Sequence, residues 1–326
     1  MICDDHEGSR QAGGLRLGRV RAAACRWAAA LAALSALALA ACAGGSVGQA
    51  ALPQTTDRAD VVVVTTLDQE YRAMLRWLEQ PNELPYRPDR WSVGELRGQY
   101  RQRAPRVVVV GAGDEGQVSG ALSTRAAIEH WRPSVVLLVG IAGGIEGAVS
   151  LGDLVLATVI WDYDIGHLGD TFEPKSTRFE PDARLLRAAR QVPSDWTRDI
   201  RVAPPQPGVV PRVVEAEVAS GDKVIETTSS AFFAAVNRAD PGFAAVEMEG
   251  AGAAAAVRRA KVLGEVASFL MIRAVSDLVE SNPSGAAPGA RVARNPQRAA
   301  WRTFAADAAA TFAAEMIRQH WLDAGP

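Results

Sequence analysis

The sequence predicts an α/β fold with three layers, in which a mixed, mostly parallel sheet is flanked by helices. Runs rich in β-branched residues alternate with Ala- and Leu-rich segments of helical pattern from Asp60 onward. This alternation is typical of a parallel sheet that is covered by helices. The chain has 326 residues, of which 48% are hydrophobic, so it is long enough for one large globular domain with additional segments.

Strands and helices largely alternate in the expected order of elements. Strands are expected where β-branched and apolar residues cluster, at Val61–Thr65, Arg106–Val110, Val135–Val139, Asp153–Ile160, Glu215–Ser220 and Phe269–Val275. Helices are expected where Ala and Leu recur with helical spacing, at Leu67–Glu79, Val118–His130, Ala183–Gln191, Ser229–Asn237, Ala251–Arg259 and Arg298–Gln319. The Pro-rich stretch 203–211 is interpreted as a surface loop, because another strand pattern follows it.

Charge and cysteine content exclude several classes of function. The net charge is −2 and acids and bases are interspersed, so no sequence-wide field favours a nucleic-acid partner. All three cysteines, Cys3, Cys25 and Cys42, lie in the first 42 residues. The rest of the chain therefore contains no disulfide, no Cys-based zinc site and no cysteine nucleophile.

The N-terminal segment has the pattern of an export signal. A stretch containing Arg16, Arg19, Arg21 and Arg26 precedes residues 27–41, which carry no charge, and this run is shorter than the roughly 20 residues of a membrane-spanning helix. It ends in Leu-Ala-Ala-Cys42, which resembles a bacterial lipobox with a lipidated cysteine. These patterns predict a signal peptide at 1–42, a flexible linker at 43–58 and one domain at 59–326. They also predict export to the cell envelope and membrane attachment through a lipid on Cys42. The alternative is an Ala-rich extension, or a start codon placed too early, on a cytoplasmic protein.

A Gly-rich loop follows the strand at Arg106–Val110. Residues 111–116 formally match the dinucleotide-binding pattern G-x-G-x-x-G, which is weak evidence when it stands alone. Asp114 and Glu115 would face a pyrophosphate, and the next strand ends at Val139-Gly140 without the acid that holds a ribose. The loop is therefore interpreted as a tight turn between strand and helix rather than as part of a Rossmann cofactor site.

Acidic residues at three places in the chain are candidates for a functional site, and those at two of the places lie beside small or apolar residues. Glu247 and Glu249 precede a helix of Gly and Ala, Asp277 follows a buried strand, and Glu70 lies in the first turn of the helix after the first strand. Each acid also has a purely structural explanation, since carboxylates favour helix N-termini and Ser-Asp pairs favour turns. Carboxylates in apolar surroundings are costly unless they are used, so these positions also indicate a functional site.

Two segments resemble the signature of the purine nucleoside phosphorylase and methylthioadenosine/S-adenosylhomocysteine nucleosidase superfamily. In chain order they are Val246-Glu247-Met248-Glu249 and Arg273-Ala274-Val275-Ser276-Asp277. The resemblance extends from about residue 60 to residue 277. It implies that Asp277 is the general acid for the leaving base, that Ser276 orients Asp277, and that Glu70 activates the attacking water. A purine leaves more readily when it is protonated, while the ribose gains oxocarbenium character.

The resemblance also implies a set of substrate-binding residues. Glu249 would accept hydrogen bonds from the ribose hydroxyls, and a carboxylate suits this task because it can accept from both. The remaining members would lie against the ribose or the base: Glu247, Met248, Val224, Ile225, Ile141, Ala142 and Gly143. Ile141 stands where bacterial nucleosidases often have Ser, and Val224 where they usually have an aromatic residue. Stacking on the base is therefore expected to be weaker, or the base to be different.

These features together favour an N-ribosyl hydrolase that acts on a purine nucleoside and needs no metal or other cofactor. Phosphorolysis is one alternative: Asp114 and Glu115 would repel phosphate, whereas Arg125 or Arg273 could approach the site. A nucleoside-binding or sensing lipoprotein without efficient chemistry is the other. Members of the family commonly form homo-oligomers, so the resemblance implies one for this chain as well.

Overall fold

The computed structural model describes residues 58–85, 89–100, 103–175, 177–240, 242–265, 268–279 and 296–323. The predicted signal peptide, Cys42 and the linker up to residue 57 lie outside the described residues, so export and lipidation stay predictions. Among the helices that the structure describes, none is long and apolar enough to cross a membrane.

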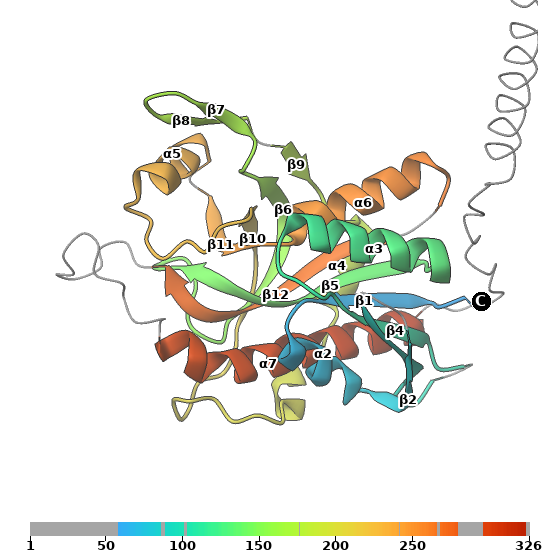
Figure 1. Cartoon of the computed structure of the whole chain (residues 1–326). Coiled ribbons are helices and arrows are strands. Elements are labelled where there is room, and N and C mark those ends of the chain that lie inside the picture. The colour runs from blue at the N-terminus through green and yellow to red at the C-terminus, as the bar shows by residue number, and fades with distance from the viewer. Residues whose placement is uncertain are drawn as a thin grey trace, which may run out of the picture. The chain divides into compact units, whose positions relative to one another are not determined.

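A ten-stranded mixed sheet forms the centre of the described chain (Figure 1). Its strands are β1 (Val61–Thr65), β2 (Leu78–Leu84), β3 (Arg90–Leu96), β4 (Arg106–Gly111), β5 (Val135–Ile145), β6 (Leu154–Asp162), β9 (Thr177–Phe179), β10 (Val213–Ser220), β11 (Phe243–Glu247) and β12 (Ser268–Val279). The order across the sheet is β11-β10-β6-β12-β5-β1-β4-β3-β2, and β9 pairs with β6. Strand β11 also pairs with β5, so part of the sheet closes into a ring.

Helices cover both faces of the sheet. They are α2 (Asp68–Leu75), α3 (Gln117–Trp131), α4 (Ala183–Arg190), α5 (Ala231–Ala239), α6 (Gly250–Val262) and α7 (Pro296–Asp323), together with a 3-10 helix at Trp196–Asp199. In Figure 1, α3 and α6 lie above the sheet, and α2 and α7 lie below it. Strands β7 (Gly166–Leu168) and β8 (Phe172–Pro174) form a separate hairpin near α5. This arrangement confirms the predicted three-layer α/β fold.

The alternation of side chains along the strands divides the interior into two main cores. Val61 and Val63 of β1 pack with the Ala-rich face of α7, whereas Val62 and Val64 pack with α3 and α6. Successive side chains of a strand point to opposite faces of the sheet, so a strand covered on both faces must be apolar throughout. The all-valine run of β1 meets this requirement and is completely buried.

Several element boundaries differ from those expected. Strand β12 continues past Val275 through Asp277 to Val279, and β5 continues through the Gly-Gly pair at 143–144 rather than ending in a turn. The helix expected at Leu67–Glu79 ends at Leu75, because the chain then enters β2. Strands β2, β3, β7, β8, β9 and β11 were not predicted. They are short or rich in polar residues and Ala, and pairing with neighbouring strands holds them.

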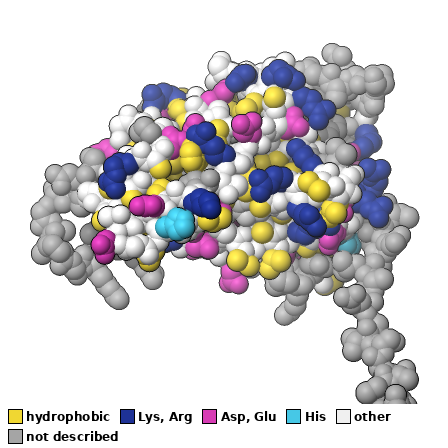
Figure 2. Space-filling view, turned by 90° about the horizontal axis from the view of Figure 1, so that it is seen from above, with side chains coloured by type: hydrophobic (Ala, Val, Ile, Leu, Met, Phe, Trp, Pro, Cys, Tyr) yellow, Lys and Arg dark blue, Asp and Glu magenta, His cyan; other side chains and the backbone are white. Residues whose placement is uncertain are grey.

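The upper face of the molecule carries a mixed surface. Figure 2 shows Lys and Arg side chains spread between Asp, Glu and hydrophobic side chains. This agrees with the interspersed charges of the sequence.

Candidate active site

A pocket lies where β1, β5, β11 and β12 end, which is the edge of an α/β sheet at which ligands commonly bind. Its empty space is about 630 Å³, including its open mouth. Nine of the predicted site residues line it: Glu70, Ile141, Ala142, Val224, Glu247, Met248, Glu249, Ser276 and Asp277. Ile225 is instead buried in the core beside α5. Gly143 is paired within β5 and contributes no side chain.

Glu70 is held rigidly at the base of the pocket. Its Oε2 accepts hydrogen bonds from the backbone N–H groups of Thr66 and Leu67, both at 2.9 Å, and its Oε1 accepts from the N–H of Ile141 at 2.8 Å. Only 2% of the residue is exposed. Burial raises the pKa of Glu70, although Arg273 and the three N–H groups oppose this rise. The result is a carboxylate of fixed orientation and increased basicity.

Arg273 lies at the centre of a buried cluster of charges. Its Nη2 donates to Glu249 Oε2 at 2.9 Å and to Glu247 Oε2, and the residue is 1% exposed. Burial opposes its charge, but the carboxylates of Glu247, Glu249 and Glu70 outweigh this effect and raise the pKa of Arg273. A Cβ at Gly140 would lie 2.6 Å from Glu70 Oε1 and even closer to Arg273 Nη1. Glycine at this position therefore leaves room for the cluster.

Glu247 and Glu249 differ in what their carboxylates contact. Both oxygens of Glu247 accept from the N–H of Gly250, at 2.9 and 3.0 Å, so this side chain caps the N-terminus of α6. Glu249 accepts from the N–H of Gly116 at 3.1 Å and from Arg273. Burial raises the pKa of Glu249 to about 7, with Arg273 opposing the shift and Glu247 adding to it. Glu247 therefore positions the helix, and Glu249 is the better placed of the two to face a ligand.

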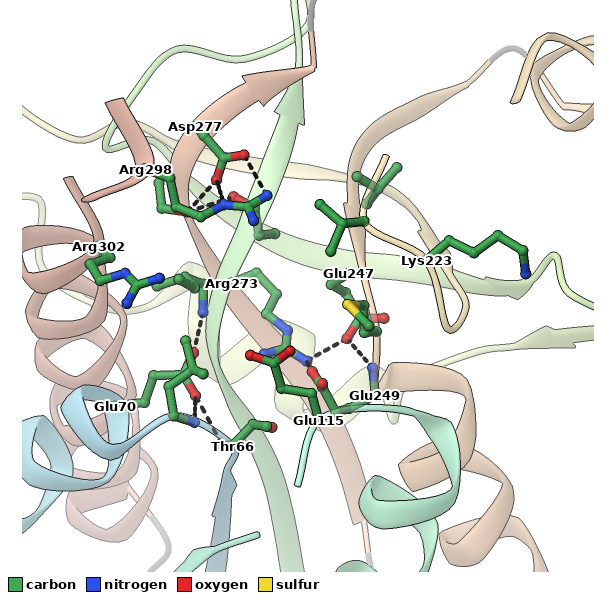
Figure 3. Close-up of a pocket in the computed structure, with 17 residues that line it drawn as sticks. Thr66, Glu70, Glu115, Lys223, Glu247, Glu249, Arg273, Asp277, Arg298 and Arg302 are labelled. Carbon is green, nitrogen blue, oxygen red and sulfur yellow. Dashed lines mark hydrogen bonds and ion pairs between the residues drawn. The ribbon is translucent and has the colours of Figure 1, made fainter. Parts of the chain in front are cut away.

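Asp277 lies at a bulge in β12. The register with β5 shifts between Val275 and Asp277, and such an extra residue re-aims the side chains of a strand. Ser276 Oγ donates to Asp277 Oδ1 at 2.6 Å. Arg298 of α7 donates from Nε to Oδ1 at 3.1 Å and from Nη2 to Oδ2 at 2.8 Å. Both oxygens of this buried acid are thus engaged by one guanidinium (Figure 3).

The structure brings further residues to the pocket that the sequence did not indicate as site residues. They are Thr66, Leu67, Lys223, Val246, Arg298 and Arg302. Glu115 also lines the pocket, as its position in the Gly-rich loop suggests. Arg125, by contrast, pairs with Glu129 and Glu265 and does not line the pocket.

The pocket wall combines charged side chains with aliphatic ones. Among the described residues that line it, no side chain is aromatic, and Val224 at the predicted stacking position is 50% exposed. Within the described part of the chain, no group of three or more His, Cys, Asp or Glu is placed to hold a metal ion. The polar side chains of the wall are carboxylates, guanidinium groups, the Lys223 ammonium group and the hydroxyls of Thr66 and Ser276.

Comparisons with known proteins agree with this geometry. The model of the phosphorylase superfamily matches residues 60–317. The chain is 31% identical over 176 residues to a 5′-methylthioadenosine/S-adenosylhomocysteine nucleosidase of Anoxybacillus flavithermus, an alignment that covers 52% of this chain and 68% of the relative. It is 26% identical over 231 residues to the nucleosidase of the same name from a Geobacillus species, covering 69% of this chain and 88% of that protein.

Solved structures show the same fold. The nucleosidase of Colwellia psychrerythraea in complex with adenine superposes with a TM-score of 0.63 at 20% identity, covering 81% of this chain and 96% of that one. The futalosine hydrolase of Helicobacter pylori gives a TM-score of 0.59 at 20% identity, covering 79% and 97%. These likenesses and the family match confirm the resemblance seen in the acidic segments, and this chain belongs to the phosphorylase superfamily.

Proposed function

We propose that this protein hydrolyses the N-glycosidic bond of a purine nucleoside. One observation carries the proposal: a single pocket gathers three buried carboxylates, Glu70, Glu249 and Asp277, from separate parts of the chain, and each has different partners. In this function Asp277 protonates the leaving base, Glu249 accepts hydrogen bonds from the ribose hydroxyls, and Glu70 takes a proton from the attacking water. The nucleosidases to which the chain is similar support this reaction class.

The environment of Glu70 supports its role as the base. A carboxylate is a stronger base when its pKa is raised, and burial raises the pKa of Glu70. Three backbone N–H groups fix the carboxylate, so little reorganisation is needed when water binds beside it.

The role of Asp277 requires a rearrangement. Both of its oxygens accept from Arg298. One of these contacts must open before Asp277 can present an oxygen to the base. Arg298 lies in the first turn of α7, so the proposal requires that this end of the helix, or the Arg298 side chain itself, moves away from Asp277.

Phosphorolysis stays a second candidate because of one specific observation. Glu115 adds negative charge to the pocket, but Arg302 lines it without an acidic partner among the described residues. A guanidinium group of this kind can bind a phosphate. The dependence of the reaction on phosphate separates the two candidates.

The test is the release of free base from adenosine, inosine and methylthioadenosine by the purified protein, with and without phosphate. We expect release without phosphate and a decrease in kcat of about 100-fold or more in Asp277→Asn. The matched control is Asp199→Asn, since Asp199 is exposed and lies outside the pocket. A strict requirement for phosphate would assign the protein to the phosphorylases, and binding without turnover would make it a nucleoside-binding protein.

Export, a lipid on Cys42 and a homo-oligomeric state are part of the same proposal. They rest on the pattern of residues 16–42 and on the family resemblance. Mass spectrometry of the mature N-terminus and light scattering of the purified protein test them directly.

A further inference from the structure

Two arginines of α7 face the pocket from one side. Arg298 and Arg302 are four residues apart, so they lie on the same face of the helix, and both line the pocket. In Figure 3 they point into the pocket on the side of Glu70, whereas Glu249 and Lys223 lie on the opposite side.

The cations of the pocket differ in their partners. Arg273 is held by Glu247 and Glu249, Arg298 by Asp277, and Lys223 by Asp164. Arg302 forms no hydrogen bond or ion pair with any residue that the structure describes, and its Nε is buried without a partner. A buried donor on a charged group is costly when it is left unpaired, so an unpaired one in a pocket points to a ligand.

Two other polar atoms of the same pocket are also unpaired in the part of the chain that the structure describes: Arg273 Nε, in a guanidinium that Glu247 and Glu249 hold through Nη2, and the hydroxyl of Thr66. The side-chain hydroxyl of Thr66 is buried and has no hydrogen-bond partner among the described residues, although its backbone N–H donates to Glu70. Arg302 only donates hydrogen bonds, and the Thr66 hydroxyl can donate as well. A group that pairs with Arg302 is therefore an acceptor, to which a hydroxyl such as that of Thr66 can also donate, and a carboxylate or phosphate matches the fork of the guanidinium.

The proposed function leaves one part of the substrate for this wall. A ribose presents its base at C1′, its hydroxyls at C2′ and C3′, and its 5′ carbon at C4′. With the base at Asp277 and the hydroxyls at Glu249, the 5′ substituent is the part that the proposed contacts do not assign. Thr66, Leu67 and Arg302 are among the lining residues to which those contacts assign no part of the substrate.

We propose that the substrate is a nucleoside with an acidic 5′ substituent and that Arg302 binds this acid. The inference rests on the proposed function, since that function places the base and the ribose. The same oxyanion chemistry would also suit a free phosphate, and the experiment separates these two sources.

The experiment compares adenosine 5′-carboxylate with adenosine 5′-carboxamide, which differ in charge but hardly in shape. We expect a kcat/KM for the carboxylate at least about tenfold above that for the carboxamide. Arg302→Gln should abolish this preference, because it lowers the kcat/KM of the carboxylate much more than that of the carboxamide. Arg302→Lys should retain part of it, since it keeps the charge and loses the fork. The control is Arg259→Gln, an exposed position on α6 outside the pocket.

Three results would overturn the proposal. One is an equal kcat/KM for the two nucleosides in the wild type, and another is an equal loss for both in Arg302→Gln, which would mean a structural role. The third is a decrease in kcat/KM for the carboxamide in Arg302→Gln that is seen when inorganic phosphate is present and not when it is absent. Arg302 would then bind phosphate. If no nucleoside releases its base, the proposed function fails separately. In that case calorimetry measures the binding of the same two nucleosides and tests the role of Arg302 by itself. Tighter binding of the carboxylate that is lost in Arg302→Gln would support it, and equal binding of the two would overturn it.

Discussion

Glu249 shows how its surroundings change the behaviour of a single residue. Desolvation raises its pKa to about 7 from the ordinary value of 4.5, and the neighbouring Glu247 adds to the shift while Arg273 opposes it. Between these two pH values the folded protein keeps a proton that the unfolded chain has lost. The stability contributed by this group is therefore complete below about pH 4.5 and is lost as the pH rises to about 7.

We expect Glu249→Gln to remove this dependence. The difference in free energy of unfolding between the variant and the wild type should shift by about 2 kcal/mol in favour of the variant from pH 5 to pH 8. The reason is that a neutral amide has no charge to desolvate. Urea unfolding at the two pH values measures the difference. Glu95→Gln, at an exposed position, serves as the control. A constant difference between Glu249→Gln and the wild type would show that the carboxylate is already charged at pH 5.

At this scale, the acids of the site and Arg273 could be predicted from the sequence, but Arg298, the cationic partner of Asp277, could not. Glu70, Glu249 and Asp277 belong to recognisable segments, and all three line one pocket. Arg298 lies 21 residues after Asp277 in the chain, on a helix outside the segments that carry the family resemblance. The pair Arg298 and Arg302, spaced by four in an Ala-rich helix, was the signal that could have indicated it.

At the scale of elements, the strands predicted correctly are those whose own residues specify them. The Val-rich β1 and β4 are buried on both faces, and their sequences show it. Strand β2 contains Pro and is mostly exposed, and β11 is a short run that pairs with β10 and β5. Pairing partners distant in sequence hold such strands, so local propensity does not identify them.

One buried acid anchors α7, which carries both pocket arginines. Asp307 is fully buried, and its Oδ1 contacts Arg76 Nη2 at 2.5 Å. Its Oδ2 accepts from the N–H groups of Arg201 at 2.6 Å and Val202 at 2.9 Å. This single side chain therefore ties α7 to the end of α2 and to the chain after the 3-10 helix.

We expect Asp307→Ala to lower the free energy of unfolding by about 3 kcal/mol or more, because it leaves three donors without their acceptor. Chemical denaturation measures this loss. Asp199→Ala, at an exposed position of the 3-10 helix, should change stability by less than about 0.5 kcal/mol. Similar losses in the two variants would mean that Asp307 does not anchor the helix.

At the scale of the whole molecule, Arg273 joins parts of the chain that are far apart in sequence. It comes from β12 and contacts Glu247 at the end of β11 and Glu249 just before α6, and its charge also acts on Glu70 of α2. The wild-type protein therefore buries three carboxylates around one guanidinium. Such a cluster adds little net stability compared with an apolar core, but removing one member leaves uncompensated charge inside the protein.

Arg273→Gln should therefore destabilise the protein in a pH-dependent way. Without the guanidinium, the pKa values of Glu70 and Glu249 rise further, because Arg273 now lowers both. At pH 8 the carboxylates must be charged or take up protons at a cost, and we expect a loss of about 3–5 kcal/mol in free energy of unfolding. At pH 5 protonation neutralises them, so the loss should be clearly smaller. Urea unfolding at both pH values, with Arg259→Gln as the surface control, measures the difference. An equal loss at pH 5 and pH 8 would mean that Arg273 stabilises the fold through its packing, and that the buried carboxylates do not depend on its charge.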